Sequence, residues 1–220
     1  FVDNRLIAQL NENDALAKYL NKSKISWVNE PELIQKLYNE LIEQDFFKVY
    51  MESPENTYAQ DKKLLEDFYQ NIVLFSEDVE TLLEEQSIYW NDDLDFVISM
   101  LLKTLKRFKE NSSAELALMP MFKDEEDEQF AKNLYRKAIL NHDENFKIVQ
   151  EHTVNWDVER IAFVDILILE MAISEFLYFP SIPTKVSLNE YIELSKYYST
   201  EKSRNFINVI LDKTLKDLKK

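Results

Sequence analysis

Two common residue types are missing from this 220-residue sequence, which has no cysteine and no glycine. Without cysteine, the chain cannot form disulfides, zinc-thiolate sites or a thiol nucleophile. Without glycine, it has no glycine-rich phosphate loop, no dinucleotide-binding fingerprint and no Asn-Gly hairpin turn. Helices can still form, because Ser, Asn and Asp are enough to cap them. The absence of glycine therefore predicts an all-α protein.

Long apolar runs are missing as well. No stretch reaches the roughly 18 to 20 apolar residues of a membrane span, and the N-terminus has neither the basic nor the apolar region of a signal peptide. Together with the lack of cysteine, this favours a cytoplasmic location. The sequence begins at Phe1 rather than at a methionine, so we expect a chain truncated at its N-terminus.

Acidic residues outnumber basic ones by 41 to 26, which gives a net charge of −15. Such a charge opposes nonspecific binding to nucleic acid. The distribution is uneven, because residues 183–220 hold eight Lys or Arg and five Asp or Glu, a net of +3, and residues 1–182 therefore carry −18. Only the C-terminal end is suited to face a phosphate backbone. The alternative interpretation is a solvated helix end that the macrodipole favours.

Apolar residues recur at i, i+3 and i+4 behind polar residues that can cap a helix. This pattern predicts about nine or ten helices and no sheet. We expect helices over about 31–42, 58–75, 79–83, 91–108, 124–139 and 157–177, then from residue 187 and from about residue 200. Asn91 should cap one of them, Ser187 and Glu190 should form a capping box, and the acidic run 124–128 should favour a helix N-terminus.

A loss of periodicity marks a boundary near the middle of the chain. Asn111, Ser112 and Ser113 are cap formers, and Pro120 breaks helices. We therefore expect an additional helical segment over residues 1–115 and a separate helical domain over residues 116–220.

The segment 157–177 has almost no polar face, which is typical of a helix enclosed by others. It should be the central helix of a bundle, with Ile161, Ile168 and Ala172 nearly fully buried. Asp165 and Glu170 are the polar residues inside it, and an unpaired buried carboxylate is costly. Each must reach solvent or meet a partner, and we interpret both as exposed at the helix edge.

Residues suited to catalysis or metal binding form no recognisable set. His142 and His152 lack the Glu-x-x-His spacing of di-iron bundles, and no third ligand marks a zinc site. We interpret both as surface histidines. The serines have neither a glycine elbow nor a nearby histidine. We therefore expect no catalytic residue, no cofactor and no metal, and a protein that is not an enzyme.

Four blocks of the C-terminal half resemble the NusB transcription antitermination family. The order and spacing of the blocks agree with the family over some sixty residues, and the resemblance extends over about residues 120–220. The blocks are WDVERIA at 156–162, LEMAISEF at 169–176, IPTKVSLNEYIELSK at 182–196 and SRNFINVILD at 203–212. The resemblance implies a NusB-like helical bundle. Residues 1–115 are similar to the extra segment of longer, Bacteroidetes-type members.

The resemblance also implies a role as an adaptor. NusB proteins pair with a small-subunit ribosomal protein, NusE, and hold boxA-type RNA in the elongation complex that transcribes ribosomal RNA operons. Carried over by position, Tyr198, Lys202, Ser203 and Phe206 would lie near the RNA, with Phe206 stacking on a base. The alternative for Phe206 is a place in the core. Two acidic positions, Glu159 and Asp165, would face the basic ribosomal protein.

Three departures from the family pattern matter. Glu170 stands where the family has Arg, and Val209 stands where it has Gly, so we expect a looser helix contact there. The family's Arg-rich N-terminal helix is not in this chain, so we expect only weak RNA binding by the chain alone. Two other readings remain open: an accessory domain of an rRNA cytosine methyltransferase, and a purely structural helical scaffold.

Overall fold

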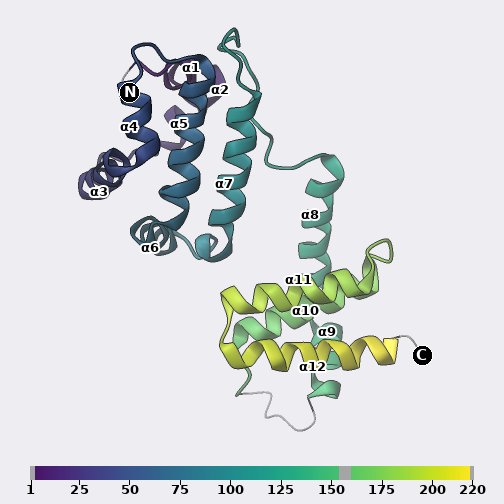
Figure 1. Ribbon diagram of the computed structural model, residues 1–220. Coiled ribbons are helices and arrows are strands. Elements are labelled where there is room, and N and C mark those ends of the chain that lie inside the picture. The colour runs from purple at the N-terminus through teal and green to yellow at the C-terminus, as the bar shows by residue number, and fades with distance from the viewer. Residues whose placement is uncertain (1–2, 154–159, 219–220) are drawn as a thin grey trace. The chain divides into compact units, whose positions relative to one another are not determined.

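The computed structural model describes residues 3–153 and 160–218. Within these ranges the chain forms twelve α-helices, one 3-10 helix and no strand (Figure 1), which confirms the all-α fold. The expected count of nine or ten is too low, because short helices such as Arg5–Glu12 and Asp45–Glu52 offer too few turns for the apolar spacing to be recognised. Every helix in these ranges is too short or too polar to span a bilayer.

The chain divides into two compact units, residues 1–120 and 121–220. The first contains α1 (Arg5–Glu12), α2 (Asp14–Ser23), α3 (Pro31–Glu43), α4 (Asp45–Glu52), α5 (Tyr58–Asn71), the 3-10 helix η1 (Val73–Phe75), α6 (Glu77–Gln86) and α7 (Trp90–Arg107). The second contains α8 (Glu125–Leu140), α9 (His142–His152), α10 (Phe163–Tyr178), α11 (Thr184–Tyr198) and α12 (Glu201–Leu218).

In the first unit, α5 packs between α4 and α7, and these three helices run alongside one another (Figure 1). Its apolar core has two parts. The first is formed by Leu33, Leu37, Leu41, Phe47, Tyr50, Leu64, Ile72 and Val79, and the second by Leu6, Leu65, Leu105 and Phe108.

A buried carboxylate joins three helices of this unit. Asp61 on α5 accepts hydrogen bonds from Nε of Arg5 at 2.8 Å and from the hydroxyl of Tyr50 at 2.7 Å. Asn4 caps α1 and also donates to the carbonyl oxygen of Asp61. Burial alone would raise the pKa of Asp61, but the hydrogen bonds and charge of Arg5, with the bond from Tyr50, lower it below its ordinary 3.8. Asp61 is therefore ionised and held by α1 and α4.

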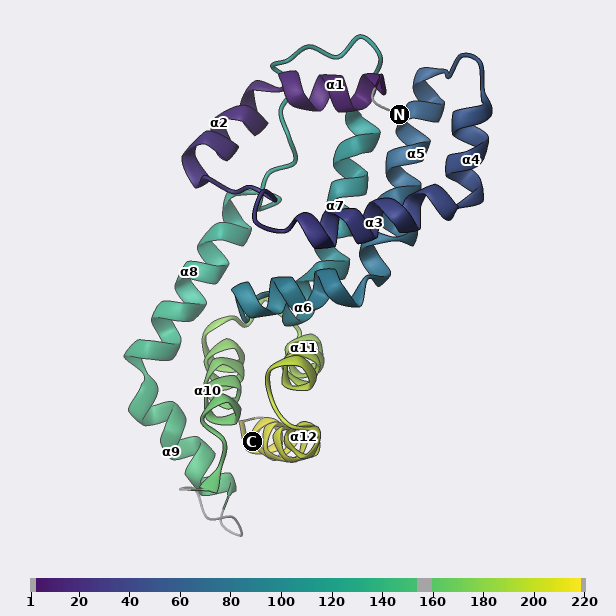
Figure 2. The same cartoon turned by 90° about the vertical axis from the view of Figure 1, so that its left-hand side faces the viewer.

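In the second unit, α10 is the central helix, because α8, α9, α11 and α12 all pack against it (Figure 2). The core around it is formed by Val149, Ile168, Leu169, Ala172, Ile173, Tyr191, Phe206, Ile207, Ile210 and Leu211. Ile168 and Ala172 are buried as expected. The predicted central position of this segment is therefore confirmed.

The central helix differs from the prediction in two ways. It begins at Phe163 rather than at residue 157, so Ile161 precedes it and is only partly buried. Its apolar side chains are not all enclosed either, because Phe163 is 71% exposed and Leu167 is also exposed. The buried face instead holds polar groups, among them Asp165, which accepts a hydrogen bond from Ser199, and Glu170, whose Oε2 lies 2.8 Å from Nδ1 of His142.

Three helix predictions need correction, two for where the helix starts and one for its continuity. The capping box at Ser187 is wrong, because α11 begins three residues earlier, after Pro183. Ser187 instead donates to Oε1 of Glu175 on α10 at 2.5 Å, and the Tyr191 hydroxyl donates to Oε2 at 2.7 Å. The helix α7 starts at Trp90 without a side-chain cap, so Asn91 does not cap it. The segment predicted as one helix over 58–75 is divided into α5 and η1.

The acidic run at the start of α8 behaves as predicted. The Asp124 carboxylate accepts a hydrogen bond from the backbone N–H of Asp127 at 3.1 Å, and the next four residues, all acidic, fill the first turn. Negative charge at this end complements the positive end of the helix dipole.

Candidate functional site

The start of α12 is held against α10 by a chain of hydroxyl groups. The Ser199 hydroxyl donates to Oδ1 of Asp165 and lies 2.9 Å from Oγ of Ser203. Ser203 Oγ lies 2.8 Å from Oγ1 of Thr200. Asp165 is 4% exposed, so its carboxylate is satisfied from within the unit rather than by water. The chain of hydroxyls fixes the first turn of α12 relative to α10.

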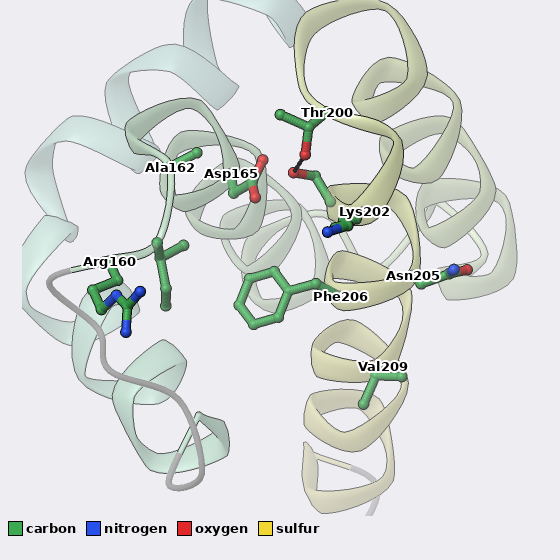
Figure 3. Close-up of a pocket in the computed structure, with 10 residues that line it drawn as sticks. Arg160, Ala162, Asp165, Thr200, Lys202, Asn205, Phe206 and Val209 are labelled. Carbon is green, nitrogen blue, oxygen red and sulfur yellow. Dashed lines mark hydrogen bonds between the residues drawn. The ribbon is translucent and has the colours of Figure 1, made fainter.

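A surface pocket of about 890 Å³ opens beside this network (Figure 3). One wall comes from the chain that leads into α10 and from its first turn, and the other comes from the first turns of α12. The lining residues are Arg160, Ile161, Ala162, Asp165, Thr200, Lys202, Ser203, Asn205, Phe206 and Val209. The Phe206 ring extends from α12 toward the wall that carries Arg160 and Ala162 (Figure 3).

The chemistry of the pocket combines an aromatic floor with cationic edges. Phe206 is 9% exposed and belongs to the apolar core, but it also lines the pocket. Arg160 and Lys202 are exposed cations on opposite walls, and Asn205 adds an exposed amide. The Asp165 carboxylate lies deeper, with its charge directed at Ser199. Such a pocket suits an anionic ligand that has a flat apolar part.

The structure brings together most of the residues that the resemblance implies. Lys202, Ser203 and Phe206 share the pocket, as expected from their spacing of one helical turn. Tyr198 does not line it and lies at the end of α11, half-buried. Glu159 lies outside the described residues.

The exposed helix edge expected for Asp165 is wrong, because its side chain is buried and accepts a hydrogen bond from Ser199. Its predicted contact with a partner protein stays a prediction.

Arg160, Thr200 and Asn205 line the pocket but were not predicted as site residues. Helical spacing could have indicated Asn205, which lies three residues after Lys202 on the same side of α12. Nothing in the spacing connects Arg160 with α12, because the two are separated by all of α10 and α11. Val209, in place of the family's glycine, lines the pocket and is half-exposed.

A second polar group joins α9 to α10. Nδ1 of His142 lies 2.8 Å from Oε2 of Glu170, and the Asn145 amide donates to the Ser174 hydroxyl at 2.8 Å. Glu170 is 4% exposed, so its expected place at the helix edge is wrong. The hydrogen bond with Glu170, and then the charge of that carboxylate, raise the pKa of His142 above its ordinary 6.5.

His142 is exposed as expected, whereas His152 is not a surface residue. Its side chain is largely buried. Its Nδ1 lies 2.8 Å from the carbonyl oxygen of Ile148, and its Nε2 lies 3.1 Å from Oδ2 of Asp217. In the part of the chain that the structure describes, no three His, Asp or Glu side chains are grouped to hold a metal ion.

Comparison with known proteins places this bundle in a family. The model of the NusB family matches residues 98–216, which is more than half of the chain. The chain belongs to the NusB family. The match includes the whole of α8 to α11 and most of α12, so every described residue of the pocket lies within the NusB region.

Three relatives carry the name transcription antitermination protein NusB. The one from Salinibacter ruber is 39% identical over 103 residues, which cover 47% of this chain and 64% of the relative. The one from Alkaliphilus oremlandii is 40% identical over 90 residues, covering 41% and 65%. The one from Chloroherpeton thalassium is 45% identical over 71 residues, covering 32% and 34%. The chain thus spans less than two thirds of the length of these NusB relatives. No solved structure matches the chain.

Proposed function

We propose that this protein is a non-enzymatic transcription antitermination adaptor, which binds boxA-type RNA together with a NusE-type ribosomal protein in the elongation complex. The observation that carries the proposal is membership of the NusB family over residues 98–216, with relatives named as transcription antitermination proteins. Residues 1–115 are proposed as an additional helical segment outside the adaptor domain, 116–220.

The pocket at the start of α12 is the proposed RNA contact. Single-stranded RNA offers phosphates for cations and bases for aromatic rings. Arg160 and Lys202 on the two walls supply the cations, and Phe206 supplies the ring. The Ser203 hydroxyl is already engaged with Thr200 and Ser199, so its main part is to hold the first turn of α12 in place. Tyr198 is proposed as an accessory contact at the end of α11.

The net charge of −15 sets a limit on this binding. The basic excess lies in residues 183–220, so the phosphates must meet the protein on the side of α12, and other surfaces repel them. A basic ribosomal protein bound to the acidic surface would cancel part of this repulsion. RNA binding is therefore proposed to be weak for the chain alone and stronger for the pair.

The test compares Lys202→Glu with Lys213→Glu, which makes the same charge change on an exposed residue of the same helix, about three turns after Lys202 and one turn after Val209, the last residue of the pocket. With the ribosomal partner present, Lys202→Glu should weaken binding to boxA-type RNA about fivefold or more and should flatten its salt dependence. Fluorescence anisotropy at several salt concentrations measures both. Equal losses for the two variants would place the RNA elsewhere.

Phe206→Ala separates the two roles of the ring. If the ring stacks on a base, RNA affinity falls by roughly 1–3 kcal/mol. If it is core alone, the free energy of unfolding falls by about 3–5 kcal/mol and the affinity of the folded fraction is unchanged. Melting temperature and RNA affinity, measured on the same variant, distinguish the two.

A further inference from the structure

In the first unit, three exposed apolar side chains lie close together in the sequence between α2 and α3. Trp27 is 48% exposed and Val28 is 82% exposed, and Ile25 is exposed beside them. The segment begins at Lys24, which ends α2 in a left-handed conformation with φ of 53°. A non-glycine residue pays for this backbone conformation. This turn ends α2 directly before the exposed apolar side chains.

Trp27 and Val28, with Ser26, form one wall of a surface groove of about 570 Å³. The other wall is a face of α3, with Pro31, Ile34, Gln35 and Tyr38. The opposite face of α3 places Leu33, Leu37 and Leu41 in the core of the unit. Both faces of α3 are therefore apolar, and among the described residues of the first unit only the face with Leu33, Leu37 and Leu41 is covered. Exposed Trp and Tyr in such a groove are typical of the residues that dominate binding energy at protein interfaces.

The charge around the groove differs from that of the unit as a whole. Residues 1–120 contain 12 Lys or Arg and 23 Asp or Glu, a net of −11. Residues 15–38, which include the whole groove, contain four lysines and two glutamates, a net of +2. Three of the lysines, Lys18, Lys22 and Lys24, lie on α2 or directly after it and are exposed. The fourth, Lys36 on α3, pairs with Asp78 at 2.9 Å. The side chains that line the groove are uncharged, and the stretch of chain that holds it is basic within an acidic unit.

We propose that this groove binds an acidic amphipathic helix of a partner protein. The apolar face of such a helix would cover Trp27, Ile34 and Tyr38, and its carboxylates would meet the lysines at the end of α2. Aliphatic side chains of the groove such as Val28 and Ile34 can pack against apolar side chains but offer no flat ring on which a base could stack, which favours a peptide over RNA.

The test uses three fluorescent probes on the full chain. The first is an amphipathic peptide of about 15 residues with Leu and Phe on one face and Glu on the other. The second is the same peptide with Lys in place of Glu, and the third is an oligouridine of about ten nucleotides. The acidic peptide should bind at least about tenfold more tightly than the basic one. Its affinity should fall as salt rises.

Trp27→Ala should lower the affinity for the acidic peptide about tenfold or more, and Lys22→Glu with Lys24→Glu should remove the preference for the acidic peptide. Tyr89→Ala and Lys103→Glu are the matched controls in the same unit, because Tyr89 is an exposed aromatic and Lys103 an exposed lysine, both outside the groove. Since Trp27 is half-exposed, its variant should keep the melting temperature, which shows that lost binding is not lost folding.

Three results would overturn the proposal. One is that the acidic peptide does not bind, or binds no better than the basic one. Another is that Trp27→Ala leaves its affinity unchanged. The third is that oligouridine binds more tightly than either peptide and loses affinity in the same variants, which would make the groove an RNA site.

Discussion

Three carboxylates of α10 are buried, and each makes a polar contact with a different neighbour. Asp165 accepts from Ser199 before α12, Glu170 pairs with His142 on α9, and Glu175 accepts from Ser187 and Tyr191 on α11. They are five residues apart, and five residues rotate a helix by about 140°. The three side chains therefore point in three directions. Each one fixes the position of a different element around the central helix.

The pair of His142 and Glu170 should make the bundle pH-sensitive. The pKa of His142 is raised in the folded state. The contribution of the pair to stability is therefore complete below about pH 6.5 and is lost as pH rises through the raised pKa. The melting temperature should therefore fall between about pH 6 and 8 more in the native protein than in His142→Gln. Thermal melts of both proteins over that range measure the difference. Parallel curves would mean that the pair does not contribute.

At this scale the sequence predicted apolar burial better than polar burial. Ile168 and Ala172 follow from the apolar spacing of their helix alone. The burial of Asp165 and Glu170 could not be predicted, because their partners lie 34 and 28 residues away in the sequence. Helical spacing predicts only contacts between residues within about one or two turns of each other. For the same reason, Lys202 and Phe206 were found together on one helix, whereas Arg160 was missed.

Helix ends in this chain are made without glycine, and α2 shows what that requires. Its last residue is followed by Lys24 in the left-handed region, a position where helices most often have glycine. Lys24→Gly should therefore stabilise the first unit by about 1 kcal/mol. Urea unfolding measures the change. Lys22→Gly, inside the last turn of the same helix, is the control and should destabilise by a similar amount. A destabilising Lys24→Gly would contradict this.

Helix existence was predicted more successfully than helix ends. The segments over α3, α7, α8 and α10 were expected from apolar spacing, but α10 starts six residues later than predicted. The starts of α7 and α11 also differ, because the candidate caps Asn91 and Ser187 lie inside the helices. The Ser187 hydroxyl donates to Glu175 on another helix, and no local sequence pattern predicts such a contact.

On the scale of the whole molecule, charge should govern assembly. A chain with a net charge of −15 should associate with the basic NusE-type protein at a rate that falls as salt rises. Glu159→Lys should slow this association severalfold, because it removes an acid from the proposed contact. Glu125→Lys, the same charge change in the exposed first turn of α8, is the control. Stopped-flow mixing at several salt concentrations measures the rates. A rate independent of salt, or equal effects of both variants, would rule out this contact.

The link between Arg5 and Asp61 also has an evolutionary consequence. Asp61 is nearly inaccessible to water, and its negative charge is held by a guanidinium from the first helix and a hydroxyl from the fourth. Replacing Arg5 alone would leave a buried anion without its cation, and replacing Asp61 alone would leave the donors of Arg5 and Tyr50 without their acceptor. Neither single step is neutral. Lineages that retain this first unit should therefore keep both residues or exchange them together, so the two positions should covary.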